Sequence, residues 1–172
     1  MWLNVLDAPS EPSIDDRTLS ISSSALTLLL CDVFARGKSI RFRARGFSMT
    51  PFIRNGDVVT IAPKKERRLG LGDIVAARHP VTGKTVVHRL VAIRSGGFML
   101  QGDNSITSDG WVSEENILGV VTQIERDNKR VWLGLGYERY GIAFLARHRL
   151  LPLTIYQGRK IFSRFLRRYK HE

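Results

Sequence analysis

Ser48 is the residue in this sequence whose surroundings best suit a nucleophile. It lies in the stretch 45–57 (RGFSMTPFIRNGD), between Gly46, which permits a bend, and Pro51, which stiffens the chain. A serine hydroxyl is a weak nucleophile at neutral pH, so it needs a base within hydrogen-bond reach. The base works best when a third group holds its tautomer. The chemistry open to Ser48 therefore depends on the base and the acid that the fold brings beside it.

His88 is the best candidate base among the four histidines. It lies within 85–93 (TVVHRLVAI), which reads as an internal strand, so a histidine there must find a partner for each ring nitrogen. We expect His79 to be exposed at a strand end, while His148 and His171 lie in the basic C-terminal segment. The simpler alternative for His88 is a buried histidine whose hydrogen bonds are satisfied and which performs no chemistry.

Two carboxylates follow His88 in the segment 101–109 (QGDNSITSD), namely Asp103 and Asp109. Glycine and Asx residues form turns whatever the function, so the alternative for both acids is an exposed position in a turn. Taken together, nucleophile, base and acid occur in the order serine, histidine, aspartate, each near the edge of an expected strand. The sequence does not decide which aspartate contacts His88.

The elements that must hold these residues are mostly short strands separated by turn-like segments, with no helices between them. We expect strands at 39–45, 57–62, 73–77, 85–93, 98–101, 117–124 and 131–135. This pattern predicts a mainly β, coiled and partly closed barrel-like domain. Residues 20–36 carry an apolar stripe at helical spacing and end at Gly37, so an N-terminal helix should pack on this domain.

Composition and charge narrow the class of protein. The net charge is +11, with an acidic beginning and a basic end, and the single cysteine, Cys31, excludes an internal disulfide and a cysteine-based zinc site. We expect no metal and no cofactor. There is no apolar run of 18 residues, and we expect no signal peptide because the first residues are acidic. The expected organisation is a flexible arm at 1–18, a helix at 19–37, the β domain at 38–136 and a basic amphipathic helical tail at 137–172.

The tail has a strong pattern after Gly158. Aliphatic and aromatic residues recur on one helical face, and the opposite face carries Arg159, Lys160, Arg164, Arg167 and Arg168. Such a helix suits an anionic membrane surface. The alternative is that its apolar face packs on the β domain and its arginines are solvated. No nucleic-acid partner is expected, because no helix-turn-helix pattern precedes the β domain.

Several short motifs in order resemble the successive boxes of type I signal peptidases, over roughly residues 40–125. The boxes are Gly46-Phe-Ser48-Met49-Thr-Pro51, Gly56-Asp57-Val-Val, Gly72-Asp73-Ile-Val, Val87-His88-Arg89-Leu, Gly102-Asp103-Asn104 and Ile117-Leu-Gly119. These enzymes belong to the serine peptidase superfamily that also includes the self-cleaving SOS-response repressors. The resemblance implies a signal-peptidase-like coiled barrel.

The resemblance also implies roles for individual residues. The usual bacterial signal peptidases and the SOS repressors have a lysine as the base, whereas the archaeal and endoplasmic-reticulum enzymes have a histidine, as this chain does at His88. Ser48 would be the nucleophile, Asp109 the acid that orients the base, and Asp103 a second functionally important acid. Ser48, Met49 and Gly46 would form the oxyanion and substrate-binding region. Family members often have a hydroxyl at the position of Gly46, so that donor is missing here.

The function that these residues imply is a serine endopeptidase that cleaves a peptide or precursor protein through an acyl-enzyme. No N-terminal membrane anchor is expected, which favours a cytoplasmic protein whose basic tail could lie at the inner face of the membrane. One alternative is a non-catalytic, peptide-binding descendant, motivated by Gly46 and the missing anchor. Another is a self-cleaving SOS-type regulator, against which we weigh His88 in place of lysine and the expected absence of a DNA-binding domain.

Overall fold

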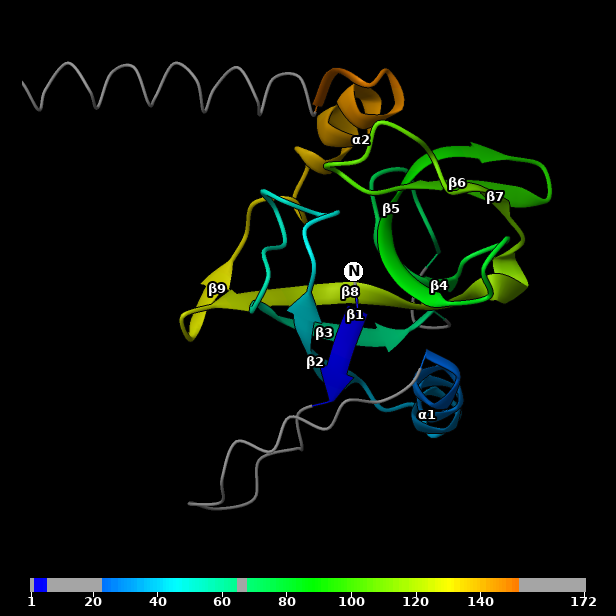
Figure 1. The fold of residues 1–172 in the computed structure, drawn as a ribbon, viewed down its shortest axis with the longest axis vertical. Coiled ribbons are helices and arrows are strands. Elements are labelled where there is room, and N and C mark those ends of the chain that lie inside the picture. Colours follow the sequence, from blue (N-terminus) through cyan, green and yellow to red (C-terminus); the bar gives the residue numbers. More distant parts are fainter. Residues whose placement is uncertain (1, 6–22, 65–67, 152–172) are drawn as a thin grey trace, which may run out of the picture.

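The computed structural model describes residues 2–5, 23–64 and 68–151, and within them nine strands form one antiparallel sheet (Figure 1). The strand order is β1-β2-β3-β8-β4-β5-β6-β7, and β9 pairs with β8. The strands are β1 (Trp2–Val5), β2 (Ile40–Arg45), β3 (Val58–Pro63), β4 (Ile74–Arg78), β5 (Thr85–Arg94), β6 (Gly97–Gln101), β7 (Gly110–Val112), β8 (Ile117–Arg126) and β9 (Lys129–Val131). The helices are α1 (Ser23–Ala35), the short 3-10 helix η2 (Glu114–Asn116) and α2 (Arg139–Arg147).

Strand β8 joins the two halves of the sheet. It pairs with β3 on one side and with β4 on the other, so that Gly119 lies opposite both Pro63 and Ala76. Register shifts interrupt the β3–β8, β4–β8 and β5–β6 pairings. Because such irregularities bend a strand and increase its twist, the sheet curls instead of staying flat. Figure 1 shows β4, β5, β6 and β7 curling over one end of β8.

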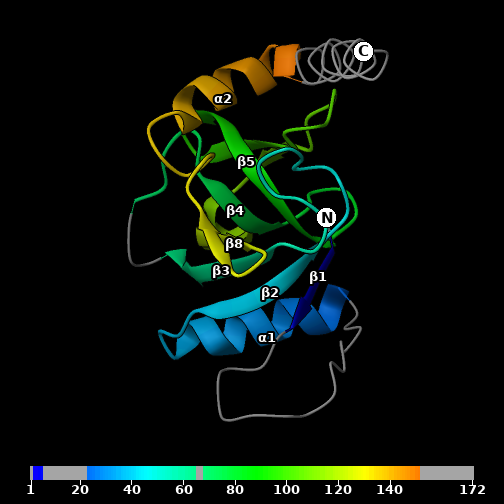
Figure 2. The same cartoon turned by 90° about the vertical axis from the view of Figure 1, so that its left-hand side faces the viewer.

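The two helices cover opposite ends of this curled sheet (Figures 1 and 2). Helix α1 buries Leu26 and Leu30 in a core formed with β2, β3 and β8. Helix α2 buries Ala143 and Ala146 against Val91 of β5. Each helix therefore shields an apolar face that the sheet alone would leave in water.

The expected fold is confirmed: the domain is mainly β, and helices lie on its N-terminal and C-terminal sides. Helix α1 ends as predicted, with Gly37 at a φ of 67° after the last turn. The strand expected at 131–135 is displaced, because β9 ends at Val131. Asp127 and Asn128, both with positive φ, form a two-residue hairpin turn that starts β9 directly afterwards.

Two short strands were not predicted. Within the segment 1–18, expected to be a flexible arm without regular structure, Trp2–Val5 form β1, which pairs with β2 so that Trp2 lies opposite Arg45. The free edge of a strand accepts a partner through backbone groups, so this pairing needs no hydrophobic periodicity. Strand β7 is only three residues long.

The remainder of the arm, 6–18, and the basic pattern at 159–168 lie outside the described residues. None of the described helices is long and apolar enough to cross a membrane.

The close approach of β3, β8 and α1 at Gly119 predicts a sharp contrast between two glycines. A Cβ at Gly119 would lie 2.6 Å from the backbone oxygen of Ala62 and 2.7 Å from Cε2 of Phe34, whereas a Cβ at Gly141 in α2 would meet nothing within 4 Å. We expect Gly119→Ala to lower the free energy of unfolding by about 1–3 kcal/mol. Gly141→Ala should raise it by about 0.5–1 kcal/mol, since alanine favours helix. Urea denaturation followed by circular dichroism measures both, and equal effects would contradict the packing.

Candidate active site

Ser48 lies in the loop that connects β2 to β3. Gly46 opens this loop with a φ of 98°, and its N–H donates to the side-chain oxygen of Asn55 at 3.0 Å. Inside the loop, the N–H of Ile53 donates to the carbonyl of Met49 at 3.0 Å, and both side chains are fully buried. The hydrogen bond from Gly46 to Asn55 therefore closes the loop at its base, and the buried side chains of Met49 and Ile53 anchor it in the core directly after Ser48.

A second loop, between β6 and β7, braces the first from outside. The backbone N–H of Asn104 donates to the carbonyl of Ser48 at 2.7 Å, and its side-chain amide donates to the carbonyl of Phe47 at 3.3 Å. Gly102 lies so close that a Cβ there would come within 2.7 Å of the Ser48 carbonyl oxygen. Glycine at this position lets the two loops touch, which places Ser48 against the segment that carries both candidate acids.

The structure brings together Ser48, His88 and Asp109. The Oγ of Ser48 lies 3.0 Å from Nε2 of His88, and Nδ1 of His88 is hydrogen-bonded to Oδ2 of Asp109. A carboxylate only accepts, so His88 donates from Nδ1 and its Nε2 is left to accept the serine proton. The side chains of His88 and Asp109 are only 8% and 12% exposed. This is the arrangement of nucleophile, base and orienting acid that acyl transfer requires.

Strand pairing sets this geometry. His88 is an internal residue of β5, opposite Val75 of β4, so its backbone position is held on the sheet. Asp109 precedes β7, and its N–H donates to the carbonyl of Leu100 on β6 at 2.9 Å. Ser48 comes from the far side of the sheet, on the loop after β2. Side chains from three separate segments therefore meet because the sheet curls.

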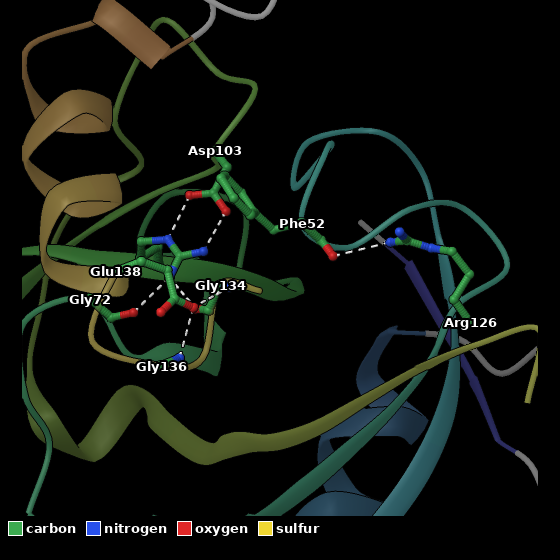
Figure 3. A network of polar contacts seen from close by, with 8 residues as sticks. Phe52, Gly72, Asp103, Arg126, Gly134, Gly136 and Glu138 are labelled. Atoms are coloured by element: carbon green, nitrogen blue, oxygen red, sulfur yellow. Dashed lines mark hydrogen bonds and ion pairs between the residues drawn. The ribbon is translucent and has the colours of Figure 1, made fainter. Parts of the chain in front are cut away.

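Asp103 takes a different partner, which answers the question that the sequence left open. Its two oxygens accept from Nε and Nη2 of Arg89, each at 2.7 Å, and both side chains are fully buried (Figure 3). Burial raises the pKa of the Asp103 carboxyl, and the Arg89 guanidinium opposes that rise. Arg89 follows His88 on β5, and successive strand residues point to opposite faces. Asp109 thus serves His88, whereas Asp103 serves Arg89.

Arg89 also links β5 to two other segments. Its Nη1 donates to the carbonyls of Gly72 and Gly134 at 2.8 and 2.9 Å, so its donors reach a carboxylate and two backbone oxygens (Figure 3). Glu138, just before α2, accepts from the N–H groups of Gly134 and Gly136. Backbone hydrogen bonds, first from its own N–H and then from these glycines, lower the pKa of Glu138. The network fastens the turn before α2 to β5, the strand that carries His88.

A second ion pair holds the end of the Ser48 loop. Asp57 accepts from Nε and Nη2 of Arg126 at 2.9 and 2.7 Å, and its side chain is almost fully buried. The same Nη2 donates to the carbonyl of Phe52 at 3.2 Å (Figure 3). The Phe52 ring lies 5.4 Å from the guanidinium carbon of Arg89. The two arginine networks therefore approach one another at Phe52, next to the loop that presents Ser48.

Three expectations about neighbouring residues change. The side chain of Met49 is fully buried in the core, so it does not face a substrate, and the exposed side chain beside Ser48 is Phe47. Gly46 acts in the turn, and its N–H is already bonded to Asn55. His79, expected to be exposed, is only 20% exposed, and its Nε2 lies 3.7 Å from Oδ1 of Asp109. Nothing in the sequence marked His79, because the contact depends on how the β4–β5 turn folds.

The comparison with known families agrees with this geometry. A family model described as peptidase S24-like matches residues 11–122, a range that contains Ser48, His88, Asp103 and Asp109. The chain belongs to the peptidase S24-like family. The resemblance to the superfamily of signal peptidases and SOS repressors is thereby confirmed. No curated protein gives a match to this chain. Family membership supports a serine peptidase or a fold of that type.

Because the two acids have different partners, their amide variants should lose very different amounts of stability. Asp103→Asn leaves the buried Arg89 without its counter-charge, so we expect a loss of about 3–5 kcal/mol in the free energy of unfolding. Asp109→Asn removes one hydrogen bond at a partly exposed site and should cost about 1 kcal/mol. Urea titrations of the two proteins at the same pH give the comparison. A greater loss for Asp109→Asn would contradict this division between the acids.

Proposed function

We propose that this S24-like protein is a signal-peptidase-like serine endopeptidase in which Ser48 is the nucleophile, His88 the general base and Asp109 the acid that orients the base. The observation that carries the proposal is the 3.0 Å contact between Ser48 Oγ and His88 Nε2, with Asp109 on the other ring nitrogen. What favours chemistry over a merely satisfied buried histidine is the identity of the two partners, a serine hydroxyl at one ring nitrogen and a carboxylate at the other.

In the proposed reaction, His88 Nε2 takes the Ser48 proton as Oγ attacks the carbonyl carbon of the scissile peptide bond. Asp109 stabilises the imidazolium that results. The imidazolium then gives its proton to the leaving amine, the C–N bond breaks and the acyl-enzyme forms. A water molecule attacks the ester carbonyl while His88 takes its proton. The proton returns to Ser48 Oγ as the C–O bond breaks and the acid product leaves.

The oxyanion of each tetrahedral intermediate needs preorganised donors. The backbone N–H of Ser48 is the donor we propose. Gly46 brings no side chain, and its N–H is directed to Asn55. Because one oxyanion donor is worth about two to three powers of ten in rate elsewhere, we expect slower turnover than in relatives that have a hydroxyl at this position.

The proposed substrate is an extended segment of a peptide or precursor protein. Phe47 and Ile106, on the two loops that meet at Ser48, are 69% and 62% exposed, which leaves apolar side chains beside the nucleophile for a peptide to contact. Because the chain resembles signal peptidases, which prefer small residues before the scissile bond, we expect the same preference in its substrate.

A fluorophosphonate probe tests the site directly, because it reacts with an activated serine without a known substrate. We expect wild-type protein to be labelled and Ser48→Ala to lose labelling completely. His88→Ala should label about three to four powers of ten more slowly, as expected for loss of the base. Ser95→Ala, in the exposed turn between β5 and β6, is the matched control and should label normally.

Absence of Ser48-dependent labelling would overturn the peptidase proposal and favour a non-catalytic peptide-binding module. In that case Ser48→Ala and His88→Ala proteins should replace the wild-type protein fully in cells.

A self-cleaving regulator is the second candidate, favoured by one observation. Strand β1 of the same chain lies along β2, with Trp2 opposite Arg45, directly before the Ser48 loop. Residues of the chain itself are therefore held beside the strand that leads to the nucleophile. Stable fragments that accumulate in purified wild-type protein and not in Ser48→Ala, identified by intact-mass spectrometry, would favour this candidate over cleavage of another protein.

Contact with an anionic membrane surface through Arg159, Lys160, Arg164, Arg167 and Arg168 is also a proposal, and these residues lie outside the described part of the chain. We expect the triple change of Arg164, Arg167 and Arg168 to glutamate to abolish sedimentation with vesicles of phosphatidylglycerol and phosphatidylcholine, since each basic residue near such a surface contributes about 1 kcal/mol. The matched control changes the exposed Lys38, Arg78 and Lys129 to glutamate. Equal loss in both proteins would show that only net charge matters.

A further inference from the structure

His79 faces the second oxygen of the acid in the candidate triad. Its Nε2 lies 3.7 Å from Oδ1 of Asp109, while His88 is bonded to Oδ2. The imidazole is 20% exposed, so most of it is buried beside the acid. Asp109 therefore lies between two histidines that come from different positions: His88 is inside β5, and His79 directly follows β4.

The turn between β4 and β5 determines which ring nitrogen of His79 carries the proton. The backbone N–H groups of Val81 and Thr82 both donate to Nδ1 of His79, each at 3.2 Å. The backbone of His79 is held as well, by Lys84 and Gly83 across the turn. A ring nitrogen that accepts carries no proton, so the neutral imidazole has its proton on Nε2, the atom nearest Asp109.

We propose that His79 is a positioning residue: its Nε2–H attracts Oδ1 of Asp109 and so keeps Oδ2 aligned with Nδ1 of His88. This proposal rests on the peptidase function proposed above. At 3.7 Å the contact is longer than a hydrogen bond, so in this structure it acts as a dipole facing a carboxylate. The last torsion of an aspartate side chain is broad and roughly two-fold. Without a group facing Oδ1, the carboxylate would turn more easily and the base would lose its orientation.

The alternative is that His79 only stabilises its own turn. Two substitutions separate these roles. His79→Asn places an acceptor oxygen near the position of Nδ1 and so keeps the turn, but it has no donor that reaches Asp109. His79→Gln places an amide N–H₂ near the position of Nε2 and so keeps the donor, but it lacks the acceptor for Val81 and Thr82. His148→Ala, at the exposed end of α2, is the matched histidine control.

The first measurement is the rate of Ser48 labelling by the fluorophosphonate probe, with melting temperature recorded for each protein. We expect His79→Asn to label roughly threefold to tenfold more slowly at an unchanged melting temperature, because it loses the Nε2–H dipole that faces Asp109, an electrostatic contact whose energy does not exceed that of one hydrogen bond. His79→Gln should label close to the wild-type rate even if its melting temperature falls, and His148→Ala should match wild type. Wild-type labelling by His79→Asn, or equal slowing in both variants, would overturn the proposal.

The second measurement needs no catalysis. In the Ser48→Ala protein, the low-field proton resonance of His88 Nδ1–H reports its bond to Asp109, and ring ¹⁵N shifts report the tautomer of His79. We expect an Nε2–H tautomer for His79, and His79→Asn should shift or broaden the His88 resonance. An unchanged resonance would overturn the positioning role while leaving the peptidase proposal intact. A shifted resonance in a protein whose Ser48 is never labelled would uphold the positioning role and defeat the peptidase proposal.

Discussion

The fully buried ion pair between Arg89 and Asp103 is the interaction around which the site is assembled. Removing two charges from water is costly, and it is sustained only when the geometry is good and the remaining donors are satisfied. Here the carboxylate is held by two parallel bonds, and further guanidinium donors bind the carbonyls of Gly72 and Gly134. One side chain on β5 thus fixes the loop after β6, the approach to β4 and the turn before α2.

This constraint matters for chemistry because of its neighbour. His88 precedes Arg89, so anchoring one side chain beneath the sheet fixes the strand from which the other projects on the opposite face. The loop between β6 and β7 is tied to Arg89 through Asp103 and to Ser48 through the N–H of Asn104. Asp109 then closes the same loop beside His88. A mobile loop would spread these atoms over several ångströms, whereas proton transfer needs them within hydrogen-bond reach.

Membership in the peptidase S24-like family supports a peptidase or a scaffold of that type, and the geometry carries the more specific proposal. In the proposed mechanism a well-ordered base, His88, works beside an oxyanion region with few donors, since Gly46 contributes no side chain and its N–H is directed to Asn55. Such a combination fits an enzyme whose nucleophile is well activated and whose turnover is modest, as would suit cleavage of one particular bond in a protein.

The sequence by itself determined the mainly β fold, the start and end of most strands, the helix α1 and the roles open to Ser48 and His88. These follow from local signals: alternation of apolar residues, glycines at turns, and the order of short motifs. Tertiary structure alone decided that Asp109 and not Asp103 faces His88, that β1 joins the sheet, that the Met49 side chain enters the core, and that His79 lies beside Asp109. The reason is physical. Two acids in one loop have the same local pattern, and only the path of the β6–β7 loop, which brings Asp103 to Arg89 and Asp109 to His88, assigns each acid its partner.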